Sequence, residues 1–134
     1  MDTSMFLSGF LYHGMIKSVF ECINQGKINL FVSSILIQEV VNKFKELGAD
    51  VQAQSEAAFF LEEKGIYIDP KVQVTVCRDP EDNFILELAQ EAHADYIVTR
   101  DKDLLSLKDQ NWKGTKITKP EDFLPILRKM NLIF

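Results

Sequence analysis

Residues 94–104 read Ala94-Asp95-Tyr96-Ile97-Val98-Thr99-Arg100-Asp101-Lys102-Asp103-Leu104. The apolar run at Tyr96–Val98 has the length and composition of a short buried strand, and a short helix is expected around Leu104. Two acids, Asp101 and Asp103, follow the strand directly. This order, strand then acids then helix, predicts a sheet whose strands end in polar side chains.

Strands and helices alternate on both sides of this stretch. Apolar residues at helical spacing, capping residues and prolines predict helices at 15–24, from Ser33–Ser34 onward, at 51–64, after Asp79–Pro80 and from Pro120. Further strands are expected at 29–32, 72–76 and 116–118. Because parallel neighbours need long crossover connections, the alternation favours an α/β fold with a parallel sheet and helices on both faces.

Length and composition predict an ordinary globular protein. The chain has 134 residues, which suit one domain spanning residues 1–134, with 46% hydrophobic and 26% charged residues. Its net charge of −5 argues against binding by general phosphate neutralisation. Cys22 and Cys77 are interpreted as reduced thiols, and no apolar run approaches the roughly 20 residues of a membrane span. We therefore expect a cytoplasmic protein without a membrane association.

Acids gather at the predicted carboxyl ends of the strands, where ligands bind in open α/β sheets. They are Asp2, Glu39, Asp82, Asp101 and Asp103. Carboxylates that converge in one cleft repel one another unless a cation compensates them, and hard oxygen ligands select Mg²⁺ or Mn²⁺. Such a site is suited to hydrolysis of a phosphodiester by an activated water.

Each acid taken alone also has a structural explanation. Asp79 before Pro80 is the arrangement that helix capping by itself would select. Glu39 and Asp82 in first helical turns could complement the helix dipole, an effect of about 0.3–1 kcal/mol. Asp101 could cap the short helix that follows it. Their joint placement at one sheet edge is what favours a metal site.

Several segments together resemble a PIN domain, and within that family the branch of VapC-like toxins. The segments are Asp2-Thr3-Ser4, the run Phe31-Val32-Ser33-Ser34 leading to Glu39, Arg78-Asp79-Pro80-Glu81-Asp82-Asn83-Phe84, and residues 94–104. The resemblance implies a three-layer α/β/α fold with a central, mainly parallel sheet. It also implies a Mg²⁺- or Mn²⁺-dependent ribonuclease of a toxin–antitoxin system, homodimeric and inhibited by a cognate antitoxin protein.

The resemblance assigns roles to individual residues. Asp2, Glu39, Asp82 and Asp101 match the four acids of the family's site, and Asp103 is expected to assist in holding the metal. Ser4 and Thr99 match small polar residues that hydrogen-bond within such sites. We expect Arg100 and Lys102, which alternate with the last two acids, to contact RNA phosphates.

One departure from the family concerns the first strand. PIN domains have an apolar strand before the first acid, whereas only Met1 precedes Asp2 here, so this strand is largely missing from the printed chain. An upstream start is one explanation, and a chain beginning at Met1 is expected to bind metal weakly. The alternative function is a catalytically inactive PIN-like module that binds protein or RNA, in which the acids serve as helix caps.

The N-terminal segment is unusually apolar. Its large apolar residues are Phe6, Phe10, Leu11, Val19 and Phe20. They suggest a surface for a dimer partner or an antitoxin, although ordinary core packing would also explain most of them.

Overall fold

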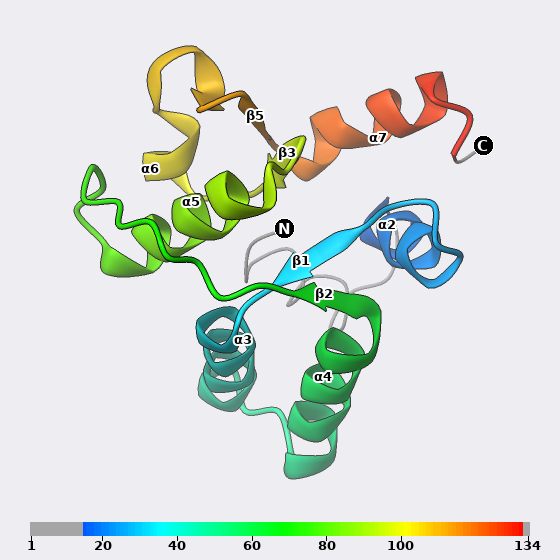
Figure 1. Cartoon of the computed structure of the whole chain (residues 1–134). Coiled ribbons are helices and arrows are strands. Elements are labelled where there is room, and N and C mark those ends of the chain that lie inside the picture. The colour runs from blue at the N-terminus through cyan, green and yellow to red at the C-terminus, as the bar shows by residue number, and fades with distance from the viewer. Residues whose placement is uncertain (1–14, 133–134) are drawn as a thin grey trace.

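The computed structural model describes residues 15–132, and element labels follow Figure 1. The helices are α2 (Met15–Asn24), α3 (Ser34–Glu46), α4 (Val51–Lys64), α5 (Pro80–Ala92), α6 (Lys102–Leu105) and α7 (Pro120–Lys129). The strands are β1 (Leu30–Val32), β2 (Gly65–Tyr67), β3 (Tyr96–Val98), β4 (Asn111–Trp112) and β5 (Thr115–Thr118), with a 3₁₀ turn, η1, at Lys108–Gln110.

The described strands form two sheets, β1-β2 and β3-β5-β4, and most of their pairing is parallel. β1 pairs in parallel with β2, and β3 pairs in parallel with β5, while the two-residue β4 runs antiparallel to β5. Figure 1 shows α3 and α4 side by side below β1 and β2, with α5 and α7 on the opposite side. The predicted three-layer α/β/α class is confirmed.

Capping chemistry fixes the starts of the two helices that follow the predicted caps. Ser33 precedes α3, and its Oγ accepts the Leu36 N–H at 3.2 Å. Asp79 precedes α5, where its Oδ1 accepts the Glu81 N–H at 2.9 Å and Pro80 occupies the first helical position. Both starts lie where the sequence predicts them, because the caps satisfy backbone N–H groups that the helices leave free.

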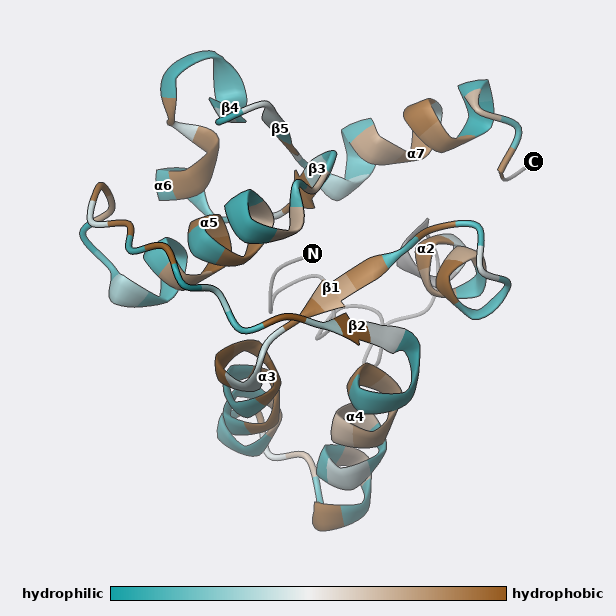
Figure 2. Ribbon diagram, viewed as in Figure 1, coloured by the Kyte–Doolittle hydropathy of each residue, from teal (hydrophilic) through white to brown (hydrophobic). Residues whose placement is uncertain are grey.

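The core lies between the sheet and its helices. Figure 2 shows β1 as mostly hydrophobic, coloured brown, and the helices around it as a mixture of hydrophilic and hydrophobic residues. The largest fully buried side chains include Phe44, Leu61, Leu86, Ile97 and Ile117. They come from α3, α4, α5, β3 and β5, so one core joins the two strand pairs.

The buried stripe of α3 differs from the expected one. The helical spacing of apolar residues predicts a core face of Ile37, Val40, Val41 and Phe44, but Ile37 and Val41 are only half-buried. Leu36, Val40 and Phe44 form the buried row instead. Their spacing of four residues places them on one line along the helix, and the side chains at 37 and 41 lie beside that line.

The predicted strand at residues 72–76 is wrong. The structure places β2 earlier, at Gly65–Tyr67, and residues 72–76 pair with no strand among residues 15–132. Side chains of α5 accept its backbone N–H groups instead. The bonds join the N–H groups of Lys71, Val74 and Cys77 to Glu91, Glu87 and Asn83, at 2.7, 2.9 and 2.9 Å. An N–H already bonded to a helix side chain cannot join a sheet, so the alternation of valines there is not a sheet pattern.

The described part of the apolar N-terminal segment packs inside the molecule. Val19 is buried, and the Phe20 ring meets the Phe60 ring edge to face with centroids 5.4 Å apart. Core packing thus accounts for Val19, while Phe20 is half-buried and packs in part against α4. Phe6, Phe10 and Leu11 lie outside the described residues.

Two further sequence interpretations concern the thiols and the membrane. Cys22 and Cys77 are both free thiols, in agreement with the prediction of no disulfide. None of the helices formed by residues 15–132 combines the length and the apolar character needed to cross a membrane.

A close approach at Gly65 yields the first prediction. A Cβ built on Gly65 would lie 2.5 Å from the Leu61 carbonyl oxygen and 2.6 Å from Cγ2 of Val32. We expect Gly65→Ala to lower the free energy of unfolding by about 1–3 kcal/mol, because the α4–β2 junction must shift to make room. Urea denaturation measures this difference.

Ser55→Ala is the matched control, since Ser55 is exposed on α4 and a methyl group there meets open solvent. Its stability should stay within about 0.5 kcal/mol of the parent. Equal stability of the Gly65 variant and the parent would contradict the steric argument.

Candidate metal site

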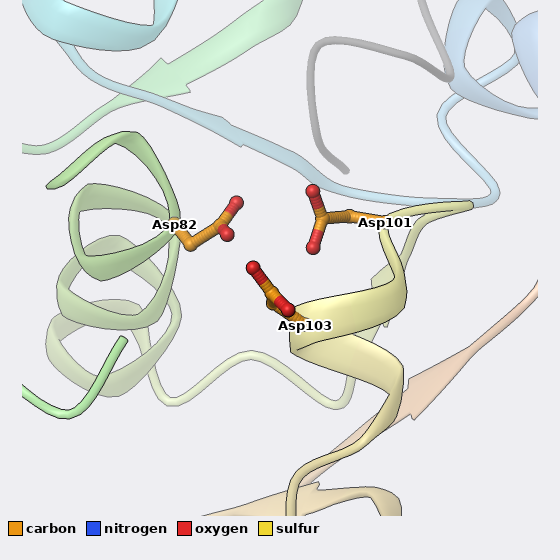
Figure 3. Close-up of side chains that lie close together, drawn as sticks. All are labelled: Asp82, Asp101 and Asp103. Carbon is orange, nitrogen blue, oxygen red and sulfur yellow. The ribbon is translucent and has the colours of Figure 1, made fainter. Parts of the chain in front are cut away.

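Three carboxylates converge at one edge of the molecule. Asp82 lies in the first turn of α5, Asp101 caps α6, and Asp103 lies in α6. Figure 3 shows the three side chains pointing toward one another from these two elements. One oxygen atom of each lies within 4.8 Å of the others. This spacing allows one divalent cation to contact all three carboxylates.

The turn after β3 fixes Asp101. Thr99 is fully buried, and its N–H donates to the Thr118 carbonyl at 2.9 Å, which continues the pairing with β5. The Thr99 Oγ1 accepts the Asp101 N–H at 2.9 Å, and Oδ1 of Asp101 accepts the Leu104 N–H at 3.0 Å. These bonds hold the backbone of Asp101 and one of its carboxylate oxygens in place. Thr99 thus positions the backbone of Asp101, one of the three clustered acids.

Asp82 is the buried member of the cluster. It is 7% exposed, and its Oδ2 is buried without a hydrogen-bond partner among the described residues. Burial raises the pKa of this carboxyl from 3.8 to about 7, with further contributions from the negative charges of Asp101, Asp79 and Asp103. A buried carboxylate oxygen without a partner is costly, and a bound cation would remove that cost. The donor set therefore fits a hard divalent cation such as Mg²⁺ or Mn²⁺.

Arg78 supplies a positive charge at the rim of the cluster. Its Nη2 lies 3.0 Å from Oδ1 and 3.3 Å from Oδ2 of Asp103. The arginine side chain is 87% exposed, so this ion pair is screened by water and contributes about 1 kcal/mol or less. Arg78 thus compensates the outermost carboxylate only weakly, and the sequence predicts no such role for it.

Asn83 holds the segment beside the cluster. Its side chain accepts the Cys77 N–H at 2.9 Å and donates to the Cys77 carbonyl at 3.2 Å. The pKa of the Cys77 thiol is raised by burial first and then by the neighbouring carboxylates, so the thiol stays protonated. Sequence reasoning missed Asn83, although its spacing of four residues from Glu87 on α5 marks a shared helix face.

The remaining predicted residues are placed as follows. Glu39 lies in α3 and is half-buried, outside the three-carboxylate cluster. Arg100 is exposed and forms an ion pair with Glu121, with 2.6 Å between Nη1 and Oε1. Lys102 is exposed at the first residue of α6. Asp2 and Ser4 lie outside the described residues.

Comparison with known proteins agrees with this geometry. The PIN domain family matches residues 1–103. The chain belongs to the PIN domain family. An uncharacterized protein of Methanocaldococcus jannaschii is 30% identical over 142 residues, which cover 96% of this chain and 90% of that protein. No solved structure matches the chain. PIN domains are generally nucleases and typically use divalent metals, so the acidic cluster of this PIN domain lies in a nuclease-type fold.

The raised pKa of Asp82 predicts how metal-free stability depends on pH. Since the folded protein holds this proton up to about pH 7 and the unfolded chain loses it near pH 4, stability falls as pH rises between these values. Each pKa unit corresponds to about 1.4 kcal/mol, so the loss reaches a few kcal/mol at most. We expect Asp82→Asn to lack this loss and to be more stable than the parent at pH 8 in chelator.

Urea denaturation from pH 4 to pH 8 in the presence of chelator measures the effect. Asp50→Asn is the control, because Asp50 is exposed at the start of α4 and asparagine caps a helix about equally well. That variant should follow the parent at every pH. If Asp82→Asn also followed the parent, Asp82 would not titrate in the way its burial requires.

Proposed function

We propose that this protein is a metal-dependent endoribonuclease that hydrolyses RNA phosphodiester bonds and acts as the toxin of a toxin–antitoxin pair. The observation that carries the proposal is the cluster of Asp82, Asp101 and Asp103, with a buried oxygen of Asp82 that lacks a hydrogen-bond partner among the described residues. Membership of the PIN domain family supports nuclease chemistry as the use of this cluster.

The proposed metal ligands combine the observed cluster with two predicted acids. Asp82, Asp101 and Asp103 would hold Mg²⁺ or Mn²⁺, and Asp2 and Glu39 are proposed to complete the site. When bound, the ion supplies an activated water and stabilises the charge that develops on the phosphodiester. The ion would also favour the ionised form of Asp82, so metal binding should release a proton below about pH 7.

Basic side chains beside the cluster are proposed to contact the RNA backbone. Lys102 is exposed, and it lies in the sequence between Asp101, which caps α6, and Asp103, which is part of that helix. Arg100 is held by Glu121 in an exposed ion pair, which is worth about 1 kcal/mol or less and can therefore be exchanged for a phosphate. Because the chain carries a net charge of −5, such contacts must be local and assisted by the metal.

RNA cleavage in the presence of Mg²⁺ or Mn²⁺ tests the proposed reaction. We expect metal-dependent cleavage that falls by about 100-fold or more in Asp82→Asn and in Asp101→Asn, because each removes a charged ligand from the cluster. The control is Asp50→Asn, the same type of change at the exposed cap of α4, outside the carboxylate cluster. This variant should cleave RNA like the parent. Fragment lengths on a gel and metal titration are the measurements.

A chain that is folded, binds Mn²⁺ and cleaves none of several RNAs would contradict the nuclease and favour the inactive binding module. Cleavage that survives chelation would contradict the metal requirement. If Asp82→Asn still cleaved RNA at the rate of the parent, Asp82 would not be a ligand of the catalytic metal.

The toxin role makes a separate prediction. Induced expression of the parent in bacterial cells should arrest growth, whereas Asp82→Asn, produced at the same level, should not, because the arrest requires cleavage of cytoplasmic RNA.

The proposed partners are a cognate antitoxin that blocks the site and a second copy of the chain in a homodimer. Analytical ultracentrifugation measures whether the chain forms the dimer. Normal growth of cells that contain the active nuclease would contradict the toxin role and leave the nuclease activity in place.

A further inference from the structure

Arg78 is a basic side chain in direct contact with the carboxylate cluster. One nitrogen of its guanidinium, Nη2, makes both contacts with Asp103, at 3.0 Å to Oδ1 and 3.3 Å to Oδ2. A guanidinium carries several N–H donors on three nitrogens, so most of them take no part in this ion pair. The side chain is 87% exposed. Arg78 is thus tied to the cluster by one nitrogen, and its other donors can engage a second anion.

The backbone of Arg78 is held in place although its side chain is exposed. Before it in the chain, Cys77 is bound twice by Asn83, a residue of α5 that is only 8% exposed. After it, Asp79 caps α5 through its side chain. Because both neighbours are tied to α5, the backbone of Arg78 stays beside the first turn of that helix, which carries Asp82. The arginine side chain can therefore change its partner without any movement of the cluster.

The ion pair of Arg78 depends on the charge of the cluster. Of the three clustered carboxylates, the guanidinium contacts the one of Asp103. A divalent cation held by all three would take up the charge of Asp103 and would repel the guanidinium. Because the ion pair is exposed to water, little free energy opposes its separation. Arg78 would therefore lose its partner when the cluster holds a cation.

A guanidinium released beside such a cation suits a phosphate. Its planar set of N–H groups matches two phosphate oxygens at once. Since the chain carries a net charge of −5, a nucleic-acid backbone needs a positive side chain at the site itself. Arg100 differs from Arg78 in this respect, because its partner Glu121 lies outside the three-carboxylate cluster and keeps its charge when a cation binds there.

We propose that Arg78 exchanges its partner when the site is loaded: it pairs with Asp103 in the metal-free protein, and it binds an RNA phosphate once a cation compensates Asp103. This role rests on the proposed function, from which it takes the metal and the RNA. Arg78 is then a substrate-binding residue that is available only at a loaded site. Metal and RNA binding become coupled through one exposed ion pair, so the metal-free protein holds RNA less tightly.

Calorimetric titration with Mn²⁺, without RNA, tests the first half of the exchange. We expect Arg78→Gln to bind Mn²⁺ about two- to fivefold more tightly than the parent, because no guanidinium then competes for Asp103. Arg128→Gln is the matched control, since Arg128 is exposed on α7 and lies outside the cluster, and it should bind Mn²⁺ like the parent. Equal or weaker Mn²⁺ binding by Arg78→Gln would overturn the exchange.

Binding of a short, labelled 2′-O-methyl RNA, measured by fluorescence anisotropy, tests the second half. With Mg²⁺, Arg78→Gln should bind this RNA about 3- to 10-fold more weakly than the parent and Arg128→Gln. The slope of log affinity against log salt should also fall in magnitude by about 0.7, which corresponds to one lost phosphate contact on a single strand. With chelator, Arg78→Gln and the parent should bind alike, because Asp103 then holds Arg78 in the parent.

The two halves can fail separately from the proposed nuclease. Weaker RNA binding by Arg78→Gln in chelator as well as in Mg²⁺ would mean that Arg78 contacts RNA without any exchange, and unchanged binding in Mg²⁺ would mean that it contacts no RNA. Either result would overturn the proposal. Both expected shifts without RNA cleavage by the parent would leave this role of Arg78 assigned and refute the nuclease. Cleavage by the parent, with metal and RNA binding unchanged in Arg78→Gln, would refute the exchange alone.

Discussion

The burial of the Asp82 carboxyl beside two further carboxylates is the constraint on which the site depends. A negative charge in that position is unfavourable, as the raised pKa of about 7 shows. The fold nevertheless holds the three groups together, because Asp82 is fixed on α5 and Asp101 is fixed by the Thr99 turn. Arg78 compensates the charge of Asp103 alone, and it does so through an ion pair that is exposed to solvent. A divalent cation would compensate these charges, which connects the electrostatics of the site to the chemistry proposed for it.

α5 connects the core to this site. Leu86 and Ile85 on one face are buried in the core, so the helix cannot rotate or slide without exposing them. Another face, with Asn83 and Glu87, bonds to the backbone of the extended segment that precedes the helix. The first turn of the same helix carries Asp82. Packing on one side and hydrogen bonding on the other thus keep this carboxyl directed at α6.

The two strand pairs, β1–β2 and β3–β5, share one hydrophobic core. Core side chains from both pairs pack together, and residues of β1 and β3 line a cavity of about 280 Å³. Buried backbone groups need a partner, which can be another strand, water or a side chain, as Glu87 is for the Val74 N–H.

Local rules were sufficient for much of the fold and for part of the site. Capping at Ser33 and Asp79, and the apolar run at Tyr96–Val98, act within a few residues, so the sequence by itself determined α3, α5, β3 and the placement of Asp82 and Asp101 at helix starts. Tertiary structure decided which strand pairs with β1, because residues 72–76 have a strand-like pattern but the N–H of Val74 bonds to Glu87 of α5. It also decided that Asp82, Asp101 and Asp103 meet while Glu39 lies outside their cluster, since that depends on how α3, α5 and α6 pack across the sheet.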